Sequence, residues 1–331
     1  MATLSGITVF PIKSCHSVKV DSCKVDNLGL TFDRNFMLIE DETNRFITQR
    51  KYASLALLQP VVDEKQGTLT LTSAEQAPLR LPLRPDISKL QVRENVQLWK
   101  DKLKVYDMGD EAAAWVTQFL INHREHDEKN HHNPEEKAVA VGKARLVTLD
   151  APTAEGYHRP AHAKLPGTHS PFTDWSPVSL GFESSLASIN DALVSTGTSG
   201  GQRIPIDRFR NNLTIRGTLP WEEDTWLVAQ IGEVTFYIIR PIARCTVPGV
   251  NQDTGIKDDW GKGNLLSFLR EKRSFKERPN HGFFCVDAIP LTRGTIHVGD
   301  EIKVLERIPE SHIAQWHQDT EQRCMHPIAT N

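Results

Sequence analysis

The sequence is poor in cysteine, and its few cysteines are far apart. Five occur in 331 residues, Cys15, Cys23, Cys245, Cys285 and Cys324, and no two of them form a C-x-x-C pair. An odd number at such wide spacing excludes a disulfide framework, so we expect a reducing compartment. The spacing also excludes zinc-ribbon and iron–sulfur cluster patterns.

Long apolar runs and an excess of one charge are also absent. No run approaches the roughly 20 apolar residues of a membrane-spanning helix. The first residues, "MATLSGITVFPIKS", lack the charged and apolar regions of a signal peptide. The 39 Lys and Arg nearly balance the 42 Asp and Glu, which argues against a nucleic-acid-binding protein. We therefore expect a cytoplasmic protein; the alternative is association with mitochondria through a tethering segment absent from this sequence.

The common catalytic and phosphate-binding motifs are missing as well. The chain has no GxGxxG or GxxxxGK[ST] loop, no nucleophile elbow at the end of a predicted strand, no HExxH and no kinase signature. Two polar stretches collect possible metal ligands, but we favour solvated, charged segments over metal sites at both. Their candidate ligands are His123, His126, His131 and His132 in one stretch and His312, His317, Cys324 and His326 in the other.

Strand patterns dominate what is present. Runs such as "GITVFPI" and "RNFMLIE" are rich in β-branched and aromatic residues, residues 35–50 are typical of a hairpin, and "IGEV" predicts a turn between two strands. Helical spacing of apolar residues predicts helices over 109–121, with Asp110 as N-cap, 183–193 and 264–273. We expect an α+β fold, strand-rich and with β-barrel character.

Changes in composition divide the chain into four parts. We expect an N-terminal β-barrel-like domain over 1–121 and a second strand-rich domain over 144–308. Between them, residues 122–143 are polar and lack hydrophobic periodicity, which predicts an exposed loop or insert. Residues 309–331 form a polar tail.

Cys245 is the main candidate for chemistry. It follows Arg244 at the end of an apolar β-like run, and Pro248 and Gly249 after it predict that the strand has ended. A nearby cation lowers the pKa of a thiol and favours the thiolate, the form that reacts and binds metals. A buried structural cysteine is the equal alternative for this stretch alone.

Other polar residues also stand at the ends of predicted strands. Arg and Lys with small hydroxyl donors suit an anionic, phosphate-bearing ligand, although each pair alone is more typical of a surface salt bridge. A soft cysteine ligand beside an anion-binding set fits an anionic, metal-bearing cofactor better than acid–base hydrolysis. The set consists of Lys13, Ser14, Asp33, Arg34, Asp174, Ser176, Arg208, Arg210, Asn211 and Asn212.

The stretches together resemble the MOSC superfamily. In family order they read "FPIKS", "DRNFMLI", "GDEAAAWVTQFL", "DWSP", "FRNN", "EDTW", "IGEV", "RCTVPGVNQDTG" and "GTIHVGD", over roughly residues 4–306. The arrangement is similar to a MOSC N-terminal β-barrel domain followed by a MOSC domain, as in the mitochondrial amidoxime-reducing components and their bacterial relatives.

The resemblance implies a molybdenum-cofactor oxidoreductase that removes oxygen from N-hydroxylated compounds such as amidoximes, hydroxylamines and N-hydroxylated base analogues. It implies Cys245 as the thiolate ligand of molybdenum, and Asp174 and Ser176 on the metal's open face. A cytochrome b5-like or other external donor, with its reductase, would supply electrons. Residues implied to hold the pterin and its phosphate are Lys13, Ser14, Arg34, Arg210, Asn212 and Arg244.

Three features depart from the family pattern. Asn211 stands where proline is common, "TVPGVNQDTG" is two residues longer than the usual "TTVDPDTG", and Phe283 lacks the hydroxyl of the usual tyrosine. Two alternatives to the oxidoreductase also stay open. One is a sulfur carrier or sulfurtransferase with a persulfide on Cys245, and the other is a non-catalytic module that binds an anion through Lys13, Arg34 and Arg210.

Overall fold

The computed structural model of the chain describes residues 1–130, 142–149, 159, 169–261 and 263–313. Five of the candidate metal ligands, His131, His132, His317, Cys324 and His326, lie outside the described residues. Among the described residues, no helix is both long enough and apolar enough to span a bilayer.

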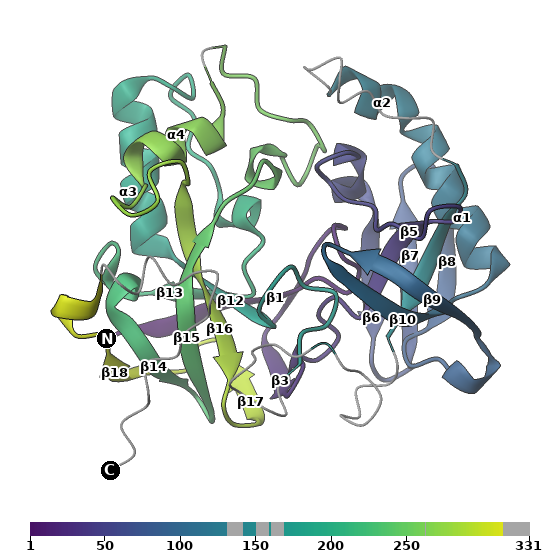
Figure 1. The fold of residues 1–331 in the computed structure, drawn as a ribbon, viewed down its shortest axis with the longest axis horizontal. Coiled ribbons are helices and arrows are strands. Elements are labelled where there is room, and N and C mark those ends of the chain that lie inside the picture. Colours follow the sequence, from purple (N-terminus) through teal and green to yellow (C-terminus); the bar gives the residue numbers. More distant parts are fainter. Residues whose placement is uncertain (131–141, 150–158, 160–168, 262, 314–331) are drawn as a thin grey trace.

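The chain forms two lobes that lie side by side (Figure 1). What we call the first lobe comprises residues 36–130 and 142–149. It contains β5 (Phe36–Glu40), η1 (Ala53–Leu57), β6 (Gln59–Asp63), β7 (Thr68–Ser73), β8 (Gln76–Pro82), η2 (Ile87–Lys89), β9 (Gln91–Leu98), β10 (Asp101–Asp107), α1 (Asp110–Asn122), α2 (Arg124–Lys129) and β11 (Ala144–Thr148). Its strands pair in the orders β5-β11-β10-β9 and β6-β7-β8.

The second lobe comprises residues 1–30 and 176–313. Its N-terminal part contains β1 (Thr3–Val9), β2 (Val18–Val20), β3 (Ser22–Asp26) and β4 (Gly29–Leu30). The rest contains β12 (Val178–Phe182), α3 (Glu183–Thr196), η4 (Ile206–Phe209), β13 (Leu213–Arg216), η5 (Glu222–Thr225), β14 (Trp226–Ile231), β15 (Val234–Ala243), η6 (Val247–Gly249), α4 (Leu265–Lys272), β16 (Phe283–Pro290), β17 (Gly294–His297), β18 (Ile302–Arg307) and η7 (Glu310–His312).

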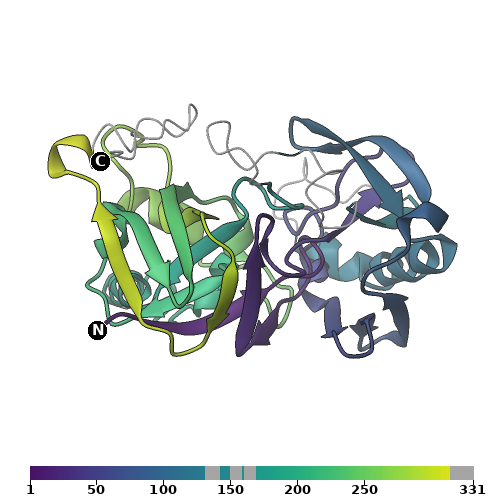
Figure 2. The ribbon, with the colours of Figure 1, turned by 90° about the horizontal axis from the view of Figure 1, so that it is seen from below.

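The main sheet of the second lobe curls until β18, the strand at one end, meets β1, the last strand but one at the other end, as Figure 2 shows from below. Its order is β18-β14-β15-β16-β12-β13-β1-β2. The amide of Leu4 donates to the carbonyl of Asp300 (2.9 Å) and the amide of Ile302 to that of Ala2 (3.0 Å), which joins β1 to the start of β18. The β-barrel character and the α+β class expected from the sequence are confirmed.

The sheet pairing crosses the expected domain boundaries. Strands β1 to β4 lie before residue 121, yet β1 pairs with β13 and β3 pairs with β17 of the second lobe. Conversely, β11 lies after residue 143 and pairs with β5 and β10 of the first lobe. The first strands of the chain thus belong to the second lobe, the following segment forms the first lobe, and the rest of the chain completes the second lobe.

Within the polar stretch 122–143, which we expect to be an exposed loop or insert, the structure shows a short helix. Residues 124–129 form α2, in which Asp127 is buried and accepts hydrogen bonds from the backbone amide (2.9 Å) and hydroxyl (2.6 Å) of Ser54. His123 stacks on Phe119 at a ring distance of 4.3 Å. These buried partners stabilise a helix that composition alone does not predict.

The predicted hairpins and helices are present, with small shifts at their ends. The two residues of the "IGEV" turn that separate β14 from β15 include Gly232, whose φ is +54°. The return of the chain at residues 40–46 is also confirmed, because the amide of Glu40 bonds the carbonyl of Arg45 at 2.8 Å. The N-cap of α1 is Gly109, not Asp110, so that prediction was off by one residue.

Candidate functional site

One cavity of about 440 Å³ collects all nine predicted site residues. It is of a size that accommodates a small-molecule ligand. Segments from both lobes line it, including the β9–β10 turn of the first lobe and the ends of β1, β13 and β15 in the second. The nine residues are Lys13, Ser14, Arg34, Asp174, Ser176, Arg210, Asn212, Arg244 and Cys245.

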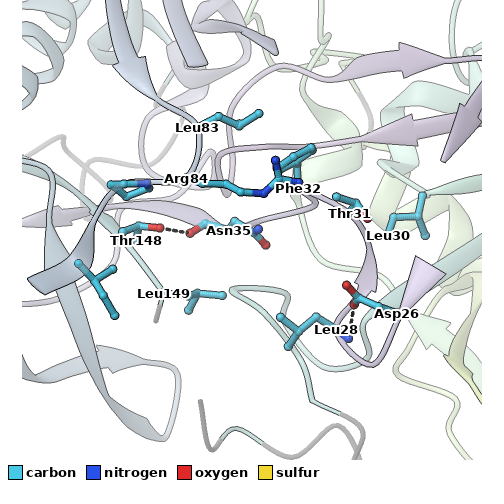
Figure 3. Close-up of a pocket in the computed structure, with 12 residues that line it drawn as sticks. Asp26, Leu28, Leu30, Thr31, Phe32, Asn35, Leu83, Arg84, Thr148 and Leu149 are labelled. Carbon is cyan, nitrogen blue, oxygen red and sulfur yellow. Dashed lines mark hydrogen bonds between the residues drawn. The ribbon is translucent and has the colours of Figure 1, made fainter. Parts of the chain in front are cut away.

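A second cavity, shown in Figure 3, is smaller and of a different character. Its volume is about 80 Å³, and its lining includes Leu28, Leu30, Phe32, Leu83 and Leu149. None of the nine predicted residues lines it. The nine predicted site residues therefore lie together at the larger cavity and not at this one.

The larger cavity carries more positive than negative charge. Asp174 pairs with Lys13, Asp287 pairs with Arg240, and Arg34 pairs with the fully buried Asp33. Among the described residues, neither Arg210 nor Arg244 forms an ion pair; both donate to uncharged oxygens instead. Two guanidinium groups without a carboxylate partner make the cavity a place for an anion, in a chain whose net charge is −3.

Arg34 and Arg210 share the ring of Phe10. Each guanidinium carbon lies 4.3 Å from the centre of this buried ring. Arg34 also donates to the carbonyl of Arg210 (3.1 Å), so the two cations are held close together. Burial and the charge of Arg34 lower the pKa of Arg210 to about 9, which still leaves it charged at neutral pH. An anion between the two would relieve their repulsion.

Lys13 and Asp174 form a charged pair inside the cavity. The Lys13 ammonium donates to Asp174 and to the carbonyl of Phe172 (2.8 Å), and Trp99 donates its indole N–H to Asp174 (3.0 Å). Burial lowers the pKa of Lys13 to about 8. Burial away from water would by itself raise the pKa of Asp174. The charge of Lys13 and the hydrogen bonds from Lys13 and Trp99 outweigh this effect and hold the pKa well below its usual range. Both groups are therefore charged at pH 7.

Asn212 and Ser176 act mainly as braces. Asn212 is 1% exposed, and its side-chain oxygen accepts hydrogen bonds from Arg34 and from the amide of Ser179, both at 3.2 Å. Ser176 is also buried and donates to Asp287 at 2.7 Å. These contacts fix the orientation of the charged groups beside them.

Several residues of the cavity lie in a left-handed backbone conformation. The φ angles are +68° at Ser14, +50° at Arg34, +53° at Arg210 and +56° at Trp99. Such angles are unfavourable by roughly 1 kcal/mol each for residues other than glycine. The surrounding contacts stabilise these strained conformations at the place where the charged groups converge.

Cys245 and Arg244 face the same cavity because the alternation of strand β15 ends at Ala243. Cys245 is a free, half-buried cysteine. The other three described cysteines do not line the cavity, and burial raises the pKa of each to about 12. The Nε of the Arg244 guanidinium is buried and has no hydrogen-bond acceptor within the described residues. This donor, one residue before a free thiol, is a candidate contact for a ligand in the cavity.

The other residues picked from the sequence lie near the cavity but do not line it. Asp33 and Arg208 are buried, and Arg208 pairs with Asp258 (3.0 Å). Asn211 bonds Thr214 at 3.0 Å on the far side of the strand. In the described regions no group of three or more His, Cys, Asp or Glu is arranged to hold a metal ion, and His123 and His126 bond backbone carbonyls instead.

Sequence reasoning missed several residues of the cavity. Trp99 and Lys100 come from the β9–β10 turn, Arg50 from the first lobe, Phe209 from η4 and Asp287 from the middle of β16. No local motif marks them. Arg159 was missed too; it is buried and bonds the carbonyls of Pro171, Thr173 and Asp174, which fixes the segment that carries Asp174.

Comparison with known proteins places the chain in a family. Residues 1–123 match the MOSC N-terminal beta barrel domain and residues 168–303 match the MOSC domain. The chain is 27% identical over 317 residues to mitochondrial amidoxime reducing component 2 of Rattus norvegicus (91% of this chain, 83% of that protein), and 28% identical over 314 residues to the Bos taurus protein of that name (91% and 83%).

It is also 24% identical over 331 residues to the molybdenum cofactor sulfurase of Homo sapiens, covering 96% of this chain and 34% of that protein. The chain thus spans about a third of the sulfurase and most of the amidoxime reducing components. With both domains matched in the order that the fold shows, the chain is a member of the MOSC superfamily, built from a MOSC N-terminal beta barrel domain followed by a MOSC domain.

Proposed function

We propose that this protein is a molybdenum-cofactor oxidoreductase that reduces N-hydroxylated compounds, such as amidoximes, hydroxylamines and N-hydroxylated base analogues. One observation carries the proposal: Cys245 shares a cavity with Arg210 and Arg244, two guanidinium groups that have no carboxylate partner among the described residues. Relatives named as amidoxime reducing components, which the chain covers over most of their length, support it.

The residues of the cavity fit such a cofactor. A thiolate is a suitable ligand for a redox metal, and arginine with lysine suits a phosphate. Because the described residues provide no cluster of three metal ligands, most ligands of a metal at Cys245 would come from the bound molecule. The unpaired Nε of Arg244 is a donor for the same molecule.

When bound, the molybdenum cofactor supplies the two-electron removal of oxygen that converts an N–OH compound, with two protons, into the N–H compound and water. The residues of this chain would bind and orient the cofactor. Cys245 would ligate the metal. The anionic part of the cofactor would be held by Lys13, Ser14, Arg34, Arg210 and Arg244. Asn212 would keep Arg34 in place, since its side-chain oxygen is already occupied.

Lys13 and Asp174 would serve the proton side of the reaction. Because its pKa is lowered to about 8, Lys13 holds a proton at Nζ that can be released near neutral pH. Asp174 accepts a hydrogen bond from that nitrogen and lies at the cavity surface with 47% of its side chain exposed. Ser176 would keep the carboxylate of Asp287 in place through its hydrogen bond to that group. Electrons would come from a cytochrome b5-like or other external donor with its reductase.

The test is the molybdenum content of the protein purified from a host that makes the cofactor. We expect about one molybdenum per chain in the wild type and in a Cys23→Ala control, and a large loss in Cys245→Ala. Cys23 is a matched control because it is free but lies outside the cavity. Absence of molybdenum from the wild type would overturn the proposal, as would full N-hydroxy reduction by Cys245→Ala.

A second candidate is a sulfur carrier or sulfurtransferase with a persulfide on Cys245. The match to a molybdenum cofactor sulfurase over 96% of this chain favours it. It predicts no molybdenum and a mass increase of one sulfur atom on a peptide that contains Cys245, which mass spectrometry would detect.

A further inference from the structure

The loop after Cys245 connects the second lobe to the first. We call residues 249–258 the bridging loop; it leaves the second lobe and lies between the two lobes (Figure 1). His126 of α2 donates its Nε2 proton to the carbonyl of Gly255 (3.0 Å), and the amide of Lys257 donates to Asn130 (2.8 Å). The Lys257 ammonium donates to the carbonyl of Arg50 (3.1 Å). The bridging loop is therefore fixed to the first lobe at both α2 and the segment before η1.

Gln252 of the bridging loop pairs with Gln49 of the first lobe. Each amide nitrogen donates to the other side chain's oxygen, at 3.1 and 3.2 Å. Both residues are buried, with 5% of Gln252 and none of Gln49 exposed. A reciprocal amide pair in a buried place has one favourable geometry, because a rotation of either amide leaves polar atoms without partners.

The same oxygen of Gln252 also accepts a hydrogen bond from Arg210. The distance to Nη1 is 2.8 Å, while Nη2 of Arg210 donates to the carbonyl of Cys15 at 2.7 Å. The guanidinium is thus held at both terminal nitrogens and stacked on Phe10 at 4.3 Å. A guanidinium has five N–H groups, so three of those of Arg210 are not used by these two hydrogen bonds. Neither Gln49 nor Gln252 lines the cavity.

We propose that Gln49 and Gln252 are positioning residues that set the anion affinity of the cavity by fixing the guanidinium of Arg210. Gln252 contacts Arg210 directly, and Gln49 acts from the other lobe by fixing Gln252. The inference rests on the proposed function for the identity of the anion, but its test needs neither molybdenum nor turnover.

The test is sulfate binding to the full chain, purified from a host that cannot make the molybdenum cofactor and measured by calorimetry at pH 7. We expect Gln252→Leu to weaken sulfate binding about tenfold, comparable to one hydrogen bond to a charged group. Gln49→Leu should weaken it too, by a smaller factor. In an Arg210→Met background both changes should have no further effect, because the group through which they act is absent.

Two further variants guard against a trivial loss of folding. Gln76→Leu removes a side-chain hydrogen bond of similar kind to Trp115, away from the cavity, and should leave sulfate binding unchanged. The double variant Gln49→Leu/Gln252→Leu leaves neither side-chain amide of the pair without its partner and should fold even where a single variant does not, yet bind sulfate as weakly as Gln252→Leu.

Three results would overturn the proposal: no sulfate binding by the wild type, wild-type affinity in the folded double variant, or equal weakening with and without Arg210. The molybdenum content of the wild type tests the proposed oxidoreductase function separately from the positioning role of the two glutamines. If the wild type contains molybdenum but the glutamine variants bind sulfate normally, only the positioning role is refuted. If the wild type lacks molybdenum but the glutamine variants weaken sulfate binding through Arg210, only the oxidoreductase is refuted.

Discussion

Anion binding in the cavity should weaken as the pH rises from 7 to 9, and Lys13 should be the cause. Burial lowers the pKa of this lysine to about 8. It is therefore about 90% protonated at pH 7 and about 10% at pH 9. Once Lys13 is neutral, the carboxylate of Asp174, which it contacts, keeps only the more distant Arg50 (3.9 Å) as a cationic partner and repels an anion more strongly. Arg210, with a pKa of about 9, keeps much of its charge over this range.

The size of the effect follows from the protonated fraction. If only the form with charged Lys13 binds, the affinity falls about tenfold between pH 7 and 9. Sulfate is a suitable probe because it does not titrate there, and calorimetry on the cofactor-free chain measures its affinity directly. Lys13→Met should bind weakly at every pH and show no decline. Lys100→Met, at an exposed position of the same cavity, should keep the decline.

Two observations would refute this reasoning. The first is a wild-type affinity that stays constant from pH 7 to 9, which would mean that Lys13 does not titrate in this range. The second is a tenfold decline that persists in Lys13→Met, which would assign the titration to another group.

Three further predictions concern stability. Asn212→Leu should lower the free energy of unfolding, measured by urea titration, by about 3 kcal/mol. The substitution removes the buried oxygen that accepts hydrogen bonds from Arg34 and from the Ser179 amide. A change below about 1 kcal/mol would contradict the role of Asn212 in holding these groups. Glu223 is only 3% exposed, and burial raises its pKa to about 7. The protonated side chain therefore contributes to the stability of the folded state, fully below the pKa of the unfolded chain, and this contribution is lost as the pH rises through 7. Glu223→Gln should therefore be more stable than the wild type at pH 8 by about 2–3 kcal/mol and lose that pH dependence, whereas an unchanged profile would show that Glu223 ionises freely. A Cβ added at Gly181 would lie 2.7 Å from Cγ of Asn211, so Gly181→Ala should lower the unfolding free energy by about 1–3 kcal/mol in calorimetry, and wild-type stability would show that Asn211 moves aside at no cost.

The predictable part of the site consists of residues at strand ends. Lys13 follows β1, Ser176 precedes β12 and Asn212 precedes β13. β12 and β13 are parallel neighbours and β1 is antiparallel to β13, so the end of β1 and the starts of the other two meet at one edge of the sheet. Polar residues next to apolar runs thus predicted the site, and the family resemblance separated them from ordinary surface pairs.

The rest could not be predicted from local patterns. Trp99 and Lys100 reach the cavity from another lobe, and Asp287 lies within a strand whose residues are all buried, where a carboxylate is unexpected. Helix α2 is stabilised by the contact of Asp127 with Ser54, which is 73 positions away in sequence. Each of these depends on contacts between distant segments, whereas the patterns used to read a sequence extend over only a few turns or strands.

The path of the chain between the lobes also has a consequence for its synthesis. The N-terminal strand β1 has its partner β13 roughly 200 residues later, with Thr3 opposite Arg216. At ribosomal rates of roughly 5–20 residues per second, β1 therefore waits for about 10–40 s for this partner. The intervening residues of the first lobe can fold in that time, while β2 covers only one edge of β1. The nascent chain thus presents an open strand edge throughout translation of the first lobe, and this edge is where a chaperone would bind it or a neighbouring nascent chain would aggregate with it.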